Sequence, residues 1–139
     1  MAEQDLPVIV VGAGPVGLAA ATHLRARGLR PLVLEAGDTV GAAMSEWGHI
    51  RTFTPWKYIV DPTAADLLAA TGWSHPTGDL PPTGAEIIER YLRPLAATLG
   101  PDVVRTGARV LAITRQGLDK SRTTGREDRP YVVRVATPA

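Results

Sequence analysis

Residues 8–35 read VIVVGAGPVGLAAATHLRARGLRPLVLE, and this stretch decides the fold. The apolar run from Leu6 to Val11 predicts a buried strand, which leads directly into residues 12–17, GAGPVG, a G-x-G-x-x-G pattern. A helix and a second strand over Leu32–Leu34 follow, and Glu35 ends that strand at about the twenty-residue spacing expected for a ribose contact. A strand, a glycine turn, a helix and a strand in this order predict a dinucleotide site.

The residues of the turn each have a physical reason to be where they are. Gly12 permits a sharp turn out of the strand, and Gly14, which lacks a Cβ, lets a pyrophosphate approach the backbone amides. Gly17 lets the helix lie close to the sheet. Pro15 falls in the first helical turn, where a missing N–H costs little. The free amides of that turn and the positive end of the helix dipole therefore favour an anion, and no lysine is needed.

Two further residues complete the unit. Gly28 is expected to end the helix at a left-handed cap. Glu35 selects among dinucleotides, because its carboxylate can accept hydrogen bonds from ribose hydroxyls but repels a 2′-phosphate. The sequence therefore favours FAD or NAD over NADP as the ligand.

Composition sets the outer bounds. The chain has 139 residues, 45% of them hydrophobic, and a formal net charge of +1, which predicts one domain and no nucleic-acid partner. It has no cysteine, which excludes a disulfide framework and a thiolate nucleophile. The N-terminus carries Glu3 and Asp5 where a secretory signal would be basic, and no apolar run is long enough to cross a membrane. We expect a cytoplasmic protein without membrane contact.

After Glu35 the periodicity is lost. Residues 36–60 contain four of the seven aromatic residues (three Trp, three Tyr and one Phe in all): Trp47, Phe53, Trp56 and Tyr58. Two interpretations stay open, since the rings can fill space between helices or can form a wall that faces a flavin.

Two helices are predicted next. Asp61 can cap a helix that starts at Pro62. Residues 83–86, TGAE, form a capping box that opens a second helix, in which Pro94 should introduce a kink or end the regular part. Gly100 closes that helix. Its core-facing side chains are expected to be Ile87, Ile88, Tyr91, Leu92, Leu95 and Leu99.

The last third of the chain predicts strands. Residues 103–106 are a candidate third parallel strand, and residues 108–114 and 131–137 alternate well enough to pair as a hairpin. The mixed-charge run 115–129 between them is typical of a solvated loop. Parallel strands in the order 3-2-1 leave the first strand on an open edge, so a neighbour is expected from further polypeptide or from another chain.

Together these features resemble the N-terminal FAD-binding part of two-dinucleotide-binding flavoproteins, the group that includes flavin-containing monooxygenases and pyridine-nucleotide-dependent reductases. The resemblance covers nearly the whole chain and implies the following contacts. Gly12, Ala13, Gly14, Pro15 and Val16, with Gly17 completing the turn, would face the FAD pyrophosphate. Glu35 would bind the adenosine ribose, and Val110 would meet the adenine through its backbone. Residues 41–56 would lie beside the flavin, with Trp47 and Arg51 as contacts.

The chain departs from the group in two places. Monooxygenases of this kind have a G-G-x-W near the flavin, whereas here Gly41-Ala42-Ala43 precedes Trp47 by a longer gap. Reductases of the glutathione type have a redox cysteine pair in this region, and this chain has none. The dithiol mechanism is therefore excluded for this segment.

The resemblance implies an α/β, Rossmann-type FAD-binding fold with a helical insertion and a C-terminal β-hairpin, incomplete in these residues. Residues 1–139 would be its N-terminal portion, without the NAD(P)H domain. The implied activity is that of a flavin-dependent oxidoreductase with NAD(P)H as co-substrate: hydride passes from nicotinamide to flavin, and an acceptor is then reduced or oxygen activated. We assign no catalytic acid or base and no metal ligand. Two alternatives stay open, an NAD-dependent dehydrogenase domain and a non-enzymatic flavin-binding module completed by a partner chain or by self-association.

Overall fold

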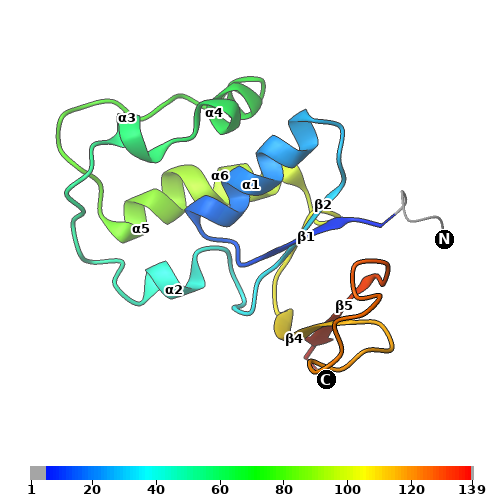
Figure 1. The fold of residues 1–139 in the computed structure, drawn as a ribbon. Coiled ribbons are helices and arrows are strands. Elements are labelled where there is room, and N and C mark those ends of the chain that lie inside the picture. Colours follow the sequence, from blue (N-terminus) through cyan, green and yellow to red (C-terminus); the bar gives the residue numbers. More distant parts are fainter. Residues whose placement is uncertain (1–5, 139) are drawn as a thin grey trace.

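The computed structural model describes residues 6–138. It has a parallel sheet, a layer of helices against that sheet, and a hairpin at the end of the chain (Figure 1). The elements in chain order are β1 (Val8–Val11), α1 (Pro15–Ala26), β2 (Pro31–Leu34), α2 (Ala42–Ser45), α3 (Trp56–Ile59), α4 (Pro62–Ala69), α5 (Gly84–Ile87), the π-helical turn η2 (Ile88–Leu92), α6 (Arg93–Leu99), β3 (Val104–Arg105), β4 (Arg109–Arg115) and β5 (Tyr131–Ala136).

The parallel sheet has the order β1-β2-β3, as the sequence predicts. Val8 pairs with Pro31, and Val33 pairs with Val104. Strand β1 begins two residues later than predicted, β2 begins one residue earlier, and β3 is one residue shorter at each end. Within residues 6–138 no strand pairs with the outer side of β1, and Val11 is 57% exposed. The predicted open edge is confirmed.

Helix α1 begins at Pro15, and the chain turns at Gly28, whose φ of +75° confirms the predicted left-handed cap. Leu18 and Ala21, both on α1, are fully buried. The hairpin is also confirmed, because β4 and β5 pair antiparallel. None of the helices in the described part of the chain has the length and apolar character needed to cross a membrane.

The aromatic residues of the loop after β2 have different environments. Trp56 is only 3% exposed and belongs to the hydrophobic core, whereas Phe53 is 99% exposed. For Trp56 the core-filling interpretation is correct. The segment also forms two one-turn helices, α2 and α3, which the sequence did not predict, because helices this short are stabilised by packing more than by their own propensity.

The second long helix accommodates Pro94 by a change of helix type. The α geometry changes to the π-helical turn η2 at Ile88 and resumes in α6 at Arg93. The helix therefore continues through Pro94, where the sequence predicted either a kink or the end of its regular part. Pro94 has no N–H for the carbonyl of Arg90, and the indole N–H of Trp73 donates to that carbonyl at 2.7 Å. All six side chains predicted to face the core are buried.

Asp61 connects three helical elements. One carboxylate oxygen accepts the Ala64 N–H at 3.0 Å and caps α4, as predicted, while the other lies 2.9 Å from Nε2 of His23 on α1. The backbone N–H of Asp61 donates to the hydroxyl of Tyr91 at 3.2 Å. Partial burial raises the pKa of Asp61, but the hydrogen bonds with His23 and Ala64 outweigh it and hold the pKa below the ordinary 3.8.

We therefore expect Asp61→Ala to lower the free energy of unfolding by about 1–2 kcal/mol at neutral pH, the usual cost of a lost N-cap. A carboxylate with a lowered folded-state pKa stabilises the fold fully above the ordinary pKa of 3.8, and this contribution disappears as the pH falls through the lower, folded-state value. Urea unfolding at pH 7 and at pH 3 tests this. The difference between wild type and variant should shrink at pH 3, and an equal difference at both pH values would contradict it.

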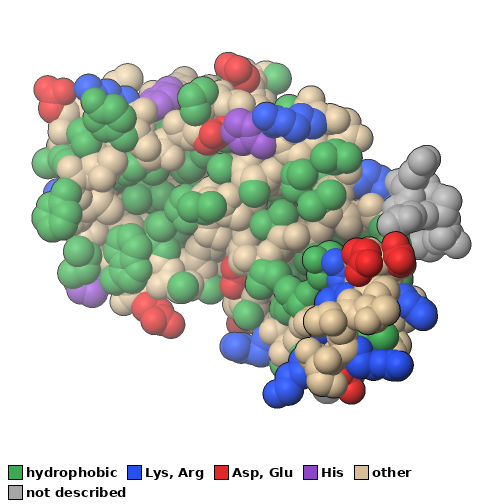
Figure 2. Space-filling model, in the orientation of Figure 1, with side chains coloured by type: hydrophobic (Ala, Val, Ile, Leu, Met, Phe, Trp, Pro, Cys, Tyr) green, Lys and Arg blue, Asp and Glu red, His purple; other side chains and the backbone are tan. Residues whose placement is uncertain are grey.

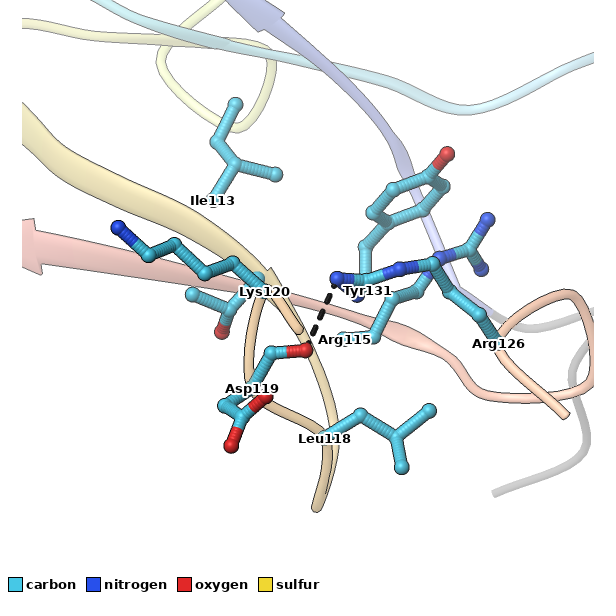
Figure 3. Close-up of a pocket in the computed structure, with 8 residues that line it drawn as sticks. Ile113, Arg115, Leu118, Asp119, Lys120, Arg126 and Tyr131 are labelled. Carbon is cyan, nitrogen blue, oxygen red and sulfur yellow. Dashed lines mark hydrogen bonds between the residues drawn. The ribbon is translucent and has the colours of Figure 1, made fainter. Parts of the chain in front are cut away.

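The loop between β4 and β5 surrounds a pocket of about 340 Å³ (Figure 3). The guanidinium of Arg126 donates to the backbone carbonyl of Asp119 at 3.0 Å, and that of Arg115 lies 3.7 Å from the ring centre of Tyr131. Both arginines thus interact with the hairpin itself. The exposed charges of residues 119–129 fit the predicted solvated loop.

Candidate functional site

The site is built around the turn between β1 and α1. Gly12 has a φ of +98° and donates its N–H to the carbonyl of Leu34 at 2.8 Å, which fixes the turn against the end of β2. The first hydrogen bond of the helix runs from the Leu18 N–H to the Gly14 carbonyl. The amides of Val16 and Gly17 precede that bond and therefore have no acceptor inside the helix. They are available to an anion at the positive end of α1.

The three motif glycines differ in what surrounds them. A Cβ built at Gly14 has no protein atom within 4 Å, so this residue faces open space. A Cβ built at Gly17 would overlap the carbonyl oxygen of Gly12 and lie 3.1 Å from its carbonyl carbon. Gly17 is therefore required by helix-to-strand packing, as predicted. The space before Gly14 is the kind of cradle that a pyrophosphate needs, and the turn fits that group.

Glu35 lies beside the turn, with its carboxylate bonded to two backbone amides. One oxygen accepts the Ala13 N–H and the other accepts the Gly37 N–H, both at 2.8 Å. The structure therefore brings Glu35 to the phosphate turn, and the contact with a ribose that the spacing predicts stays a prediction. Each carboxylate oxygen retains further acceptor capacity, so ribose hydroxyls can bind as well.

Ala13 is fixed from both sides. Its N–H donates to Glu35, and its carbonyl accepts the Gly41 N–H at 3.0 Å. Ala13 is fully buried. Its amide is thus already satisfied by the protein, and a direct contact of Ala13 with a ligand stays a prediction. Sequence reasoning did not connect Gly37 or Gly41 to the phosphate turn, although two glycines so soon after the acidic residue were a usable signal.

The start of the hairpin also reaches Glu35. The N–H of Ala108 donates to the backbone carbonyl of Glu35 at 2.8 Å, and the N–H of Gly107 donates to that of Gly37 at 2.8 Å. Val110 follows on β4, where it is half-buried and pairs with Val135 on β5. The strand predicted to meet an adenine therefore begins next to the residue predicted to bind the ribose.

Trp47 and Arg51 contact a different part of the molecule. The Trp47 ring packs on Gly84, where an added Cβ would lie 2.8 Å from it. Arg51 donates to the carbonyl of Pro81 at 2.6 Å and lies 3.8 Å from the carboxylate of Glu86. Both contacts join the start of α5, and a flavin contact by either residue stays a prediction.

The fold and the glycine turn define a Rossmann-type nucleotide-binding domain. Residues 7–138 match the family model described as FAD dependent oxidoreductase, and the chain belongs to that family. FAD is therefore the cofactor, and the NAD-dependent dehydrogenase alternative loses its support.

Known proteins share parts of this sequence. The chain is 41% identical over 69 residues to ferredoxin–NADP reductase of Lactococcus lactis subsp. cremoris, which covers 50% of this chain and 19% of that protein. It is 43% identical over 67 residues to thiamine thiazole synthase of Archaeoglobus fulgidus, which covers 48% of this chain and 24% of that protein. The chain thus spans a quarter or less of these relatives.

Solved structures share the fold. Bacillithiol disulfide reductase Bdr from Bacillus cereus superposes with a TM-score of 0.63 at 20% identity, over 93% of this chain and 36% of that one. OTEMO in complex with FAD and NADP gives a TM-score of 0.67 at 21% identity, over 98% of this chain and 24% of that one.

Proposed function

We propose that these residues are the N-terminal, FAD-binding portion of a cytoplasmic, flavin-dependent NAD(P)H oxidoreductase. The observation that carries the proposal is the open cradle at Gly14, which lies before the unpaired amides of α1 and beside the carboxylate of Glu35. An anionic dinucleotide with a free ribose diol matches this arrangement of donors and acceptors. When bound, FAD supplies two-electron transfer at its isoalloxazine ring.

In this proposal the residues of the site bind and orient the cofactor. The amides of Gly14, Val16 and Gly17 hold the pyrophosphate, and Glu35 accepts hydrogen bonds from the adenosine ribose. Val110 meets the adenine through its backbone. On the flavin side we keep Trp47 and Arg51, because both are anchored by contacts at the start of α5 and are exposed.

Turnover with NAD(P)H requires more than these residues provide. The described chain contains one glycine-rich turn, and holding a nicotinamide against the flavin requires a second binding unit. A groove of about 730 Å³ lies between the open edge of β1 and the hairpin, lined by apolar side chains including Val8, Val11, Ile113 and Tyr131. Figure 2 shows Lys and Arg side chains gathered on the hairpin side of this region. Further polypeptide, a partner chain or a second copy would supply the missing neighbour of β1.

The purified 139 residues should therefore retain flavin weakly, self-associate, and oxidise NADH little faster than free flavin does. The tests are the visible absorption spectrum, light scattering after size exclusion, and NADH consumption with and without added FAD. A flavin spectrum supports the cofactor assignment. Steady NADH turnover by a monodisperse monomer would contradict the proposal, because it requires a nicotinamide site within these residues.

Glu35 should discriminate between FAD and FAD with a phosphate on the adenosine 2′-hydroxyl. The phosphate places negative charge against the carboxylate and removes a hydroxyl donor. Glu35→Ala should weaken FAD binding by about 1–3 kcal/mol, the range for charge-assisted hydrogen bonds, and should reduce the discrimination. Titrations of both ligands against wild type and variant measure this. Equal affinity of the wild type for the two ligands would show that Glu35 does not bind the ribose.

A further inference from the structure

We propose that Glu35 is also a positioning residue, which holds the phosphate turn in its binding conformation before any ligand arrives. The inference rests on the proposed nucleotide site. The sequence spacing predicted that Glu35 binds the ribose. The proposal adds a second function for Glu35, at the pyrophosphate half of the site.

The geometry supports the proposal through Ala13. Its N–H is held by one oxygen of Glu35 at 2.8 Å, and its carbonyl is held by the Gly41 N–H at 3.0 Å. The carbonyl of Ala13 and the N–H of Gly14 belong to one planar, trans peptide unit and point in opposite directions. The bond from Gly41 therefore directs the Gly14 N–H away from the loop that contains Gly41. The side of Gly14 where a Cβ would stand is free of protein atoms.

The other oxygen of Glu35 holds the loop that supplies Gly41. It accepts the Gly37 N–H at 2.8 Å, and the Gly37 carbonyl in turn accepts the N–H of Gly107. One carboxylate thus connects the turn before α1 to the segment 37–41 after β2. Without it, the Ala13 amide would be buried and unpaired, which is unfavourable for a backbone donor.

The chemistry requires a carboxylate of this length. Glutamine offers one oxygen and would place an NH₂ group against a backbone N–H, so it can satisfy only one of the two amides. Aspartate is one methylene shorter and cannot span the same two donors from the same backbone position. If Glu35 contacted only the ribose, these substitutions would not change the affinity for a ligand that lacks ribose hydroxyls.

The experiment follows from that difference. ADP and 2′,3′-dideoxy-ADP share the diphosphate and the adenine, but the second lacks the diol. Both are titrated against wild type, Glu35→Gln and Glu35→Ala, with Asp38→Ala as the matched control, because Asp38 is a nearby exposed carboxylate. We expect both Glu35 variants to lose at least tenfold in affinity for dideoxy-ADP, and Asp38→Ala to lose none. Unchanged dideoxy-ADP affinity in the Glu35 variants would overturn the positioning role.

Hydrogen exchange gives a readout that requires no ligand, and its wild-type measurement requires no variant. In the ligand-free wild type the amides of Ala13 and Gly37 should exchange much more slowly than that of Val16. Glu35→Ala, which removes both acceptor oxygens, should accelerate exchange at Ala13 and at Gly37. Rapid exchange at Ala13 in the wild type would overturn the proposal even if both variants failed to fold. Wild-type protein that binds neither nucleotide but protects Ala13 would refute the nucleotide site and leave the positioning contact standing.

Discussion

Replacing Gly14 with valine should abolish FAD binding and leave the fold intact. The φ and ψ of Gly14, −86° and −172°, are in the extended region that valine favours, and the space around its missing Cβ is free of protein atoms. The branched side chain would occupy the space that the pyrophosphate must enter. Loss of two charge-assisted hydrogen bonds costs about 3 kcal/mol or more, so affinity should fall at least about 100-fold.

Flavin content after purification and a titration with FAD measure the binding, and circular dichroism with thermal melting measures the fold. Thr124→Val is a suitable control for handling, since Thr124 is an exposed residue of the hairpin loop, far along the chain from the glycine turn. Unchanged flavin content in Gly14→Val would remove the basis for placing the pyrophosphate at this turn.

Replacing Gly17 with alanine should have the opposite effect and strongly destabilise the fold. An added Cβ would overlap the backbone oxygen of Gly12, and backbone atoms at this turn are fixed by the bonds of Gly12 to Leu34 and of Ala13 to Glu35. The helix would have to move away from the sheet. Small domains are stable by only about 5–15 kcal/mol, and overpacking that forces a backbone shift costs about 1–3 kcal/mol or more.

The measurement is the soluble yield and the urea midpoint of Gly17→Ala beside those of Gly14→Val. We expect the first variant to be insoluble or strongly destabilised and the second to unfold like the wild type. A Gly17→Ala protein with wild-type stability would show that α1 does not approach β1 as closely as the structure indicates. The two glycines are three residues apart in one motif, so the comparison separates ligand approach from packing.

The local elements of the fold could be predicted because local rules determine them. The glycine turn, Pro15, the Asp61 cap and the Thr83–Glu86 capping box all lie within a few residues of the groups they serve. Their backbone requirements are therefore visible in the sequence itself. The strand pairing followed from the same information, because parallel strands joined by a helix have one preferred connection.

The environment of individual side chains depended on contacts between distant residues. Trp56 is in the core and Phe53 in solvent, although both belong to one aperiodic aromatic segment. Pro94 did not end its helix, because a π-helical turn and the indole of Trp73 accommodate the carbonyl that a proline cannot pair. Neither outcome has a signature in the neighbouring sequence.

Glu35 shows which features the sequence determines and which the tertiary structure decides. The sequence by itself determined that an acidic residue ends the second strand near a glycine turn, since spacing alone fixes that. Only the tertiary structure decided that its two oxygens are shared between Ala13, 22 positions away, and Gly37, and that Gly41 holds the other side of Ala13. The physical reason is that buried amides must find acceptors, and which acceptor is in reach depends on how the loops pack and not on their order in the chain.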